Sequence, residues 1–243
     1  MAYRRTPAVQ ARLDAQREAV LQSAVLLLAE RGYGGCTMAA VADRAGIATG
    51  SLYQHFANKA ELSVQLFRRV VTREIDAVNA ALAQRDTPQQ RIAAVVETFA
   101  TRALRARRLA YALLVEPADA VVDGERLVFR RAFRDVIAAE IAAAVAGGEL
   151  PEQDPVLTAA ALVGAVGEAL AGPLATAPRQ SGDQHSGDRQ SSDQLSSDRQ
   201  SSDRHSGADA SHSDTLHSDN TTVVPALVSF TLRALGGRDD SDA

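Results

Sequence analysis

The stretch T-M-A-A-V-A-D-R-A-G-I-A-T-G-S-L-Y-Q-H-F-A-N-K-A-E-L, residues 37–62, decides the fold. It contains three candidate helix starts, because Thr37, Thr49 and Asn58 each carry a short side-chain oxygen that can accept from a free backbone N–H. The residue three positions after Asn58 is a glutamate, which is the spacing of a capping box. Gly46 separates the first two helices and can adopt the positive φ of a sharp reversal. Two short helices joined by such a turn form a helix-turn-helix, whose second helix can enter a DNA major groove.

The side chains of this stretch divide into an inner and an outer set. The inner, apolar positions would hold the unit together, and they are Val41, Ala42, Ile47, Leu52 and Phe56. Hydroxyl, imidazole and amine groups near helix starts suit phosphate oxygens. We therefore expect phosphate contacts from Thr37, Tyr53, His55 and Lys59, with Arg44 as a lesser candidate. Base contacts are expected from residues of the second helix, namely Thr49, Gly50, Ser51 and Gln54. Gly50 has no side chain and so allows the helix backbone to approach the bases closely.

This stretch resembles the DNA-binding motif of the TetR family of bacterial transcriptional regulators. The family signature has the form T-x-x-x-[IV]-A-x-x-A-G-[IV]-x-x-G-x-[LI]-Y-x-[HY]-F-x-[NS]-K-x-x-L, and every fixed position is matched here. The resemblance implies an all-α fold with an N-terminal three-helix helix-turn-helix domain and a C-terminal helical domain for effector binding and dimerisation. It further implies a homodimeric repressor that binds double-stranded operator DNA and is released by a small-molecule effector.

Composition agrees with a helical protein of the cytoplasm. The chain has 243 residues, of which 46% are hydrophobic and only 4% aromatic, and the scarcity of β-branched runs favours packed helices over a sheet. A single cysteine, Cys36, permits no internal disulfide, which is typical of a reducing compartment. The formal net charge is −4, but residues 1–60 carry an excess of basic side chains, as a phosphate-binding unit requires.

Helical periodicity and turn residues predict the order of the elements. A first helix ends at Gly32, and a long helix spans residues 58–84. The next helix begins at a capping box formed by Thr87. Four more helices are expected at about 105–116, 119–146, 154–171 and 223–235. We expect five regions: a flexible basic arm at 1–13, the helix-turn-helix domain at 14–74, a helical regulatory domain at 75–178, a disordered Ser/Asp-rich insert at 179–220, and a last dimerisation helix with its tail at 221–243.

The regulatory region contains most of the remaining aromatic residues. In the family the corresponding helices enclose an effector, so the candidate pocket residues are Phe67, Phe99, Tyr111, Phe129 and Phe133. Ordinary core packing explains each of them equally well, since apolar helical spacing does not distinguish the two roles. Glu97 and Glu116 could receive a cationic ligand. A basic cluster could receive an anionic one, and it comprises Arg102, Arg105, Arg107 and Arg108.

The insert consists of degenerate five-residue repeats in which aspartate recurs at every fifth position from Asp183 to Asp203. A period of five fits neither a helix nor a strand, and the segment has too few large apolar residues to form a core. It holds four of the five histidines, His185, His205, His212 and His217. Their spacing matches no compact ligand motif, so we expect no metal site there.

Several other functions are disfavoured by the sequence. No nucleophile–base pair or glycine-rich phosphate loop is evident, so we expect neither catalysis nor a cofactor. Residues 156–177 are apolar apart from Glu168, yet they are chiefly alanine and glycine without basic flanks, which argues against a membrane span. A DNA-binding activator or architectural protein that responds to no effector remains an alternative to the repressor.

Overall fold

The computed structural model describes residues 6–175 and 220–236. Within these ranges the secondary structure is entirely helical, which confirms the predicted all-α class. The helices are α1 (Pro7–Gly35), α2 (Met38–Arg44), α3 (Thr49–Leu52), α4 (Lys59–Leu82), α5 (Pro88–Arg105), α6 (Arg107–Leu114), α7 (Ala120–Ala146), α8 (Pro155–Ala175) and α9 (Asn220–Ala234).

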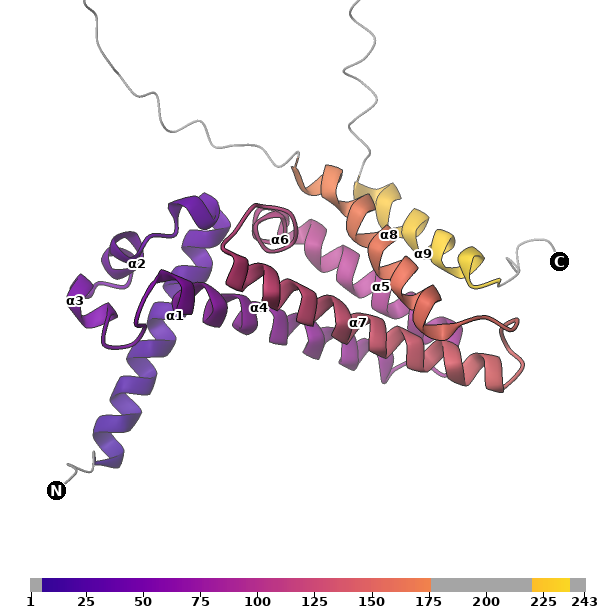
Figure 1. Cartoon of the computed structure of the whole chain (residues 1–243), viewed down its shortest axis with the longest axis horizontal. Coiled ribbons are helices and arrows are strands. Elements are labelled where there is room, and N and C mark those ends of the chain that lie inside the picture. The colour runs from indigo at the N-terminus through magenta and orange to yellow at the C-terminus, as the bar shows by residue number, and fades with distance from the viewer. Residues whose placement is uncertain (1–5, 176–219, 237–243) are drawn as a thin grey trace, which may run out of the picture.

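The helices form two parts that are joined along α1, α4 and α6 (Figure 1). At one end, α2 packs on α1 and α3 packs on α2. At the other end, α5 and α7 pack along α4, while α8 and α9 lie on α5 and α7. One core cluster of buried side chains runs from α1 through α4 and α7 to α8, so the two parts share a continuous apolar interior. A shift of α4 or α6 therefore reaches the helix-turn-helix through packed contacts.

Helix α1 begins earlier than the sequence suggested. Thr6 caps it by accepting from the N–H of Val9 at 3.4 Å, and Pro7 occupies the first turn. The predicted arm boundary at residue 13 is therefore wrong, since Arg12 lies on the helix. The predicted end at Gly32 is confirmed in its geometry, because Gly32 has φ 66° and ψ −172° and kinks the helix before its last few residues.

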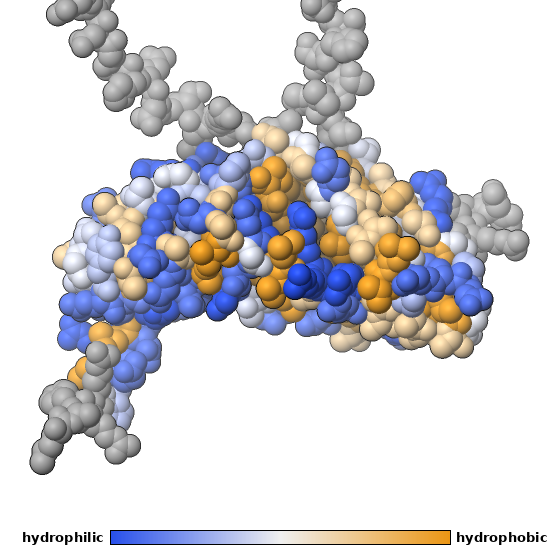
Figure 2. All heavy atoms as spheres, in the orientation of Figure 1, coloured by the Kyte–Doolittle hydropathy of each residue, from blue (hydrophilic) through white to orange (hydrophobic). Residues whose placement is uncertain are grey.

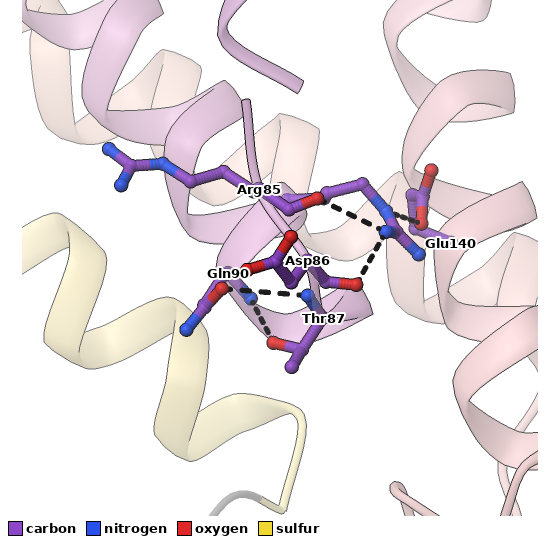
Figure 3. Close-up of polar contacts among 6 residues, drawn as sticks. Arg85, Asp86, Thr87, Gln90 and Glu140 are labelled. Carbon is purple, nitrogen blue, oxygen red and sulfur yellow. Dashed lines mark hydrogen bonds and ion pairs between the residues drawn. The ribbon is translucent and has the colours of Figure 1, made fainter. Parts of the chain in front are cut away.

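The entry into α5 shows how closely local sequence controls this fold (Figure 3). Thr87 and Gln90 form the predicted reciprocal capping box, with Pro88 in the first turn. Arg91 then holds the preceding loop, because it donates to the Arg85 and Asp86 carbonyls while its Nε contacts Glu140 of α7 at 2.7 Å. The start of α5 is thereby fixed to α7.

The boundaries of α8 and α9 differ from those predicted, and each helix contains a proline. Helix α8 was expected to end near residue 171, but it continues past Pro173 to Ala175. A proline so close to the end removes only one helical hydrogen bond, and burial of Leu174 in the second core cluster favours continuation. Helix α9 begins at Asn220, earlier than the expected residue 223, and Pro225 falls within it.

Two sequence predictions concern residues outside this description. The disordered character of the 179–220 insert and its lack of a metal site fall on residues 176–219, which the structure does not describe. The same holds for Arg4 and Arg5 of the predicted arm. Among the described residues, no group of three or more His, Cys, Asp or Glu side chains is placed to hold a metal ion.

Candidate nucleic-acid interface and effector cavities

The helix-turn-helix is set by two local features that the sequence predicted. The Thr37 hydroxyl accepts from the N–H of Ala40 at 3.2 Å and so caps α2. Gly46 has φ 67°, which allows the chain to reverse between α2 and α3. Val41, Leu52 and Phe56 are almost completely buried beneath these helices, as expected for the inner set.

Helix α3 is short, Thr49–Leu52, and it is not capped as the sequence predicted. Ala48 is its N-cap and provides no side-chain hydrogen bond, so the prediction that Thr49 caps the helix is wrong. Beyond Leu52 the chain forms a tighter turn, in which the N–H groups of Gln54 and His55 donate to carbonyls three residues back. Asn58 has extended backbone angles and caps α4.

Most of the predicted DNA-contacting side chains lie on one exposed segment. Thr49, Gly50 and Gln54 are exposed, Ser51 and His55 are half-buried, and Tyr53 has 52% of its surface exposed although it is a large aromatic residue. The surface of this end of the molecule is largely hydrophilic (Figure 2). A short helix with an exposed ring and small polar side chains beside it is suited to a groove lined by phosphates.

Arg17 of α1 supports this segment from behind, a contact that the sequence did not reveal. Its guanidinium donates to the carbonyl of His55 at 2.7 Å and lies 4.5 Å from the centre of the Phe56 ring. The charge of Arg17 is satisfied there by a carbonyl oxygen and an aromatic face.

Replacement of Arg17 by alanine is expected to destabilise the protein by about 2 kcal/mol, because a charge-assisted hydrogen bond and a cation–π contact are both lost. Urea unfolding followed by circular dichroism measures the change. Arg12→Ala is the matched control, since Arg12 is exposed on the same helix and should change stability by less than about 0.5 kcal/mol. Equal effects of the two substitutions would contradict the supporting role of Arg17.

Two predicted phosphate-binding cations already have partners within the chain. Arg44 forms a two-pronged ion pair with Glu30 of α1, and this pairing lowers the pKa of the Glu30 carboxyl. Lys59 donates to the carbonyl of Tyr33 at 3.2 Å. An ammonium group has three donors, so Lys59 can hold Tyr33 and a phosphate together. Arg44 is mainly a link between α1 and α2.

Four of the five predicted effector-pocket residues form one aromatic cluster. Phe129 is its centre, with its ring centroid 4.6 Å from that of Phe133, 6.3 Å from Phe67 and 6.4 Å from Phe99. Two cavities meet at this cluster and share Phe99, Leu114 and Phe129. They contain about 460 and 610 Å³ of space between side chains, part of it open to solvent.

Polar groups are few in these cavities and lie at their edges. Arg102 lines the first cavity together with Glu74, to which its Nε donates at 2.6 Å. Arg130 lines the second cavity from an exposed position on α7. An apolar interior with a charged edge suits a ligand that has a long apolar part and a charged end.

Tyr111 does not join the aromatic cluster, and the basic residues of α5 and α6 do not form one site. Tyr111 lines a separate cavity between α1 and α6. Arg108 donates to the Glu30 carbonyl at 2.6 Å, whereas Arg102 pairs with Glu74. The sequence grouped these arginines as one basic cluster, but α5 ends at Arg105 and the non-helical backbone of Ala106 separates it from α6.

Glu116 has a structural partner where the sequence suggested a cationic ligand. Its Oε1 accepts from the N–H of Tyr33 at 3.0 Å, at the kink of α1. Arg126 of α7 holds the end of α6 by donating to the carbonyls of Ala112, Leu113 and Glu116. Glu97, the other candidate, is exposed on α5.

Cys36 is a buried packing residue in this structure. Its side chain is 3% exposed, and burial raises the pKa of the thiol to about 11. A thiol with such a pKa is almost fully protonated at neutral pH and is a poor nucleophile. The surroundings of Cys36 therefore favour a role in packing over one in redox chemistry.

Comparison with known proteins places the interface in a family. Residues 20–66 match the profile of "Bacterial regulatory proteins, tetR family". The chain is 37% identical over 86 residues to the transcriptional activator FasR of Mycolicibacterium smegmatis, and 42% identical over 60 residues to the transcriptional repressor KstR2 of Mycobacterium tuberculosis. These matches cover 35% and 25% of this chain but only 39% and 30% of the relatives.

A solved structure resembles nearly the whole described fold. FadR from Bacillus subtilis, determined in complex with stearoyl-CoA, superposes with a TM-score of 0.61 over 87% of this chain and 97% of its own, at 18% identity. At that identity the likeness concerns the fold alone. The matched profile agrees with the helix-turn-helix geometry of α2 and α3, and the shared fold extends over the described helices. Residues 20–66 therefore carry the DNA-binding motif of the tetR family of bacterial regulatory proteins.

Proposed function

We propose that this protein is a homodimeric transcriptional repressor that leaves its operator when a small molecule occupies the aromatic cavities. The single observation that carries the proposal is the exposed segment Thr49–Gln54, whose inner residues are buried and whose outer residues have the composition of a groove-binding surface. Each subunit places α3 in one major groove of a pseudo-palindromic site in the cytoplasm. The two copies then lie roughly 34 Å apart, or a multiple of that distance.

A dimer is supported by apolar surface on α8 and α9. Within one chain, α8 exposes Leu157 to 69% and Val156 to 54%, and α9 exposes Phe230 to 43%. Figure 2 shows hydrophobic surface gathered over this part of the molecule. Helix α8 is also long and apolar enough to cross a membrane by length and composition. Pairing of α8 and α9 with their copies covers the same surface without a membrane, and small residues such as Gly164 allow close helix approach.

The effector we propose is an acyl thioester of coenzyme A. The FadR structure holds stearoyl-CoA, and the cavities at Phe129 offer an apolar space for an acyl chain with Arg102 and Arg130 at the edges. Occupation of these cavities separates α4, α6 and α7, whose side chains form the walls. Because α4 and α6 also contact α1, the position of α3 changes with them, and the DNA-competent state becomes less populated.

The second candidate function is an activator, and the similarity to FasR favours it over an architectural protein. Both candidates bind DNA through the same surface. They differ in the outcome of transcription in vitro with the selected site placed upstream of a promoter: a repressor lowers transcript yield and an activator raises it.

The deciding experiment starts with selection of bound sites from random duplex DNA by the full chain. Anisotropy titration of the selected site then measures affinity with and without stearoyl-CoA, with free coenzyme A as the control. We expect a two-fold symmetric site and release by the acyl thioester only. Failure to enrich any sequence would refute the DNA-binding proposal, whereas enrichment without release would refute the proposed effector.

Substitutions within the exposed segment should have distinct signatures. Tyr53→Ala is expected to weaken binding to every duplex and to reduce the slope of log affinity against log salt by about 1 if a phosphate contact is lost. Gln54→Ala should mainly relax the preference for one base pair, at a cost of about 1–3 kcal/mol. Anisotropy titrations at several salt concentrations separate the two. Identical salt slopes and site preferences in both variants would contradict the assigned roles.

A further inference from the structure

A further cavity lies away from the aromatic cluster, where the end of α1, helix α6 and the end of α8 meet. It contains about 860 Å³ of space, part of it open to solvent. Its walls combine an apolar floor, including Leu28 and Leu174, with the polar side chains of Arg31, Arg108 and Tyr111. Helix α6 separates it from the first aromatic cavity, because Leu109 and Leu113 face that cavity while Arg108 and Tyr111 face this one.

The walls of this cavity carry more positive than negative charge. Arg31 and Arg108 are both cationic, and the only acidic residue in the lining is Glu116. The Glu116 carboxylate already accepts from Tyr33. Among the described residues, the Arg31 side chain and the Tyr111 hydroxyl form no hydrogen bond or ion pair, although the charge of Arg31 contributes, after that of Arg44, to lowering the pKa of the Glu30 carboxyl. The cavity therefore presents a guanidinium and a hydroxyl that are available to a ligand, next to a second guanidinium.

Contacts at the two ends of α6 connect this cavity to the helix-turn-helix. At its start, Arg108 donates to the Glu30 carbonyl, and the Glu30 carboxylate pairs with Arg44 of α2. After its end, Glu116 accepts from the N–H of Tyr33, and the Tyr33 carbonyl accepts from Lys59. A ligand between α1 and α6 would act on both connections.

We infer that the cavity between α1 and α6 is a second ligand site, which takes a small molecule with a phosphate or carboxylate oxyanion on an apolar body. Arg31 and Arg108 bind the oxyanion as paired forks, Tyr111 donates to it, and the apolar body rests on Leu28 and Leu174. Binding draws Arg108 from the Glu30 carbonyl and loosens the link to Arg44. This effect on DNA rests on the proposed function, whereas the binding itself does not.

The test is calorimetric titration of the DNA-free full chain with sodium phosphate and, separately, sodium acetate, at constant ionic strength set by sodium chloride. Arg31→Gln removes one cation without disturbing a hydrogen bond of the fold. Arg73→Gln is the matched control, because Arg73 is exposed on α4 and lines none of these cavities. Circular dichroism confirms that both variants fold as the wild type does.

We expect saturable binding of at least one of the two anions, weakened about ten-fold by Arg31→Gln and unchanged by Arg73→Gln. Saturation by phosphate alone identifies a phosphorylated ligand, by acetate alone a carboxylate, and by both a general oxyanion site. Absence of saturable heat with either anion, or equal affinity in wild type and Arg31→Gln, would overturn the inference. A parallel DNA titration, in which phosphate weakens operator binding by wild type more than by Arg31→Gln, tests the link to α2 separately.

Discussion

Gly50→Leu is expected to abolish sequence-specific DNA binding while leaving the fold intact. Gly50 lies in α3 with an ordinary backbone conformation, and a Cβ added there meets no atom within 4 Å. Neither the backbone nor the packing of the free protein therefore requires glycine. A close approach by a partner does, because a leucine side chain on this surface would collide with base edges in the groove.

The expected loss is at least about 1,000-fold in operator affinity, which leaves only non-specific binding. Stability should be unchanged or raised by up to about 1 kcal/mol, because leucine has the higher helix propensity. Anisotropy titration and urea unfolding measure the two quantities. Gly124→Leu is the matched control, since Gly124 lies in α7 with equally open surroundings. If Gly50→Leu bound operator as tightly as Gly124→Leu does, α3 would not be the recognition helix.

The features that the sequence predicted correctly are governed by neighbours within a few residues. The caps at Thr37, Asn58 and Thr87 and the positive φ of Gly46 all depend on short side chains or a missing Cβ next to a turn. Even here one detail differs. In the capping box expected at Asn58, the Glu61 carboxylate accepts from the N–H of Ala57 instead of that of Asn58. The reciprocal hydrogen bond is therefore displaced by one residue.

The features that the sequence did not reveal join residues that are far apart along the chain. Arg17 contacts His55 across 38 positions, and Glu116 contacts Tyr33 across 83. Helical periodicity shows which face of α6 is inward, but it does not show which neighbour that face meets. For this reason Tyr111 was grouped with the phenylalanines, although it lines the cavity against α1.

The contact between Glu116 and Tyr33 depends on Gly32, and substitution of this glycine is expected to cause a large loss of stability. Gly32 has φ 66° and ψ −172°, a conformation that only glycine adopts readily. A Cβ at this position would lie 2.5 Å from one Glu116 carboxylate oxygen and 2.6 Å from the other. Any side chain at residue 32 therefore strains the backbone and also displaces Glu116 from the Tyr33 N–H.

Gly32→Ala is expected to destabilise the protein by about 3 kcal/mol, the sum of roughly 1–2 kcal/mol of backbone strain and a similar amount for the lost Glu116 hydrogen bond. Urea unfolding measures the loss. Gly34→Ala is the matched control, because a Cβ there meets nothing within 4 Å and its φ is not positive.

A double-mutant cycle with Glu116→Ala separates the two causes of that loss. Because Gly32→Ala and Glu116→Ala both remove the contact with Tyr33, the double variant should lose less stability than the two single variants together, by about 1 kcal/mol or more. Strict additivity would mean that Glu116 does not hold α1 at the kink. The hydrogen bonds from the end of α6 through Tyr33 to Lys59 would then not couple the regulatory helices energetically to the helix-turn-helix. The remaining described polar link between α6 and α2 would be the contact of Arg108 with Glu30.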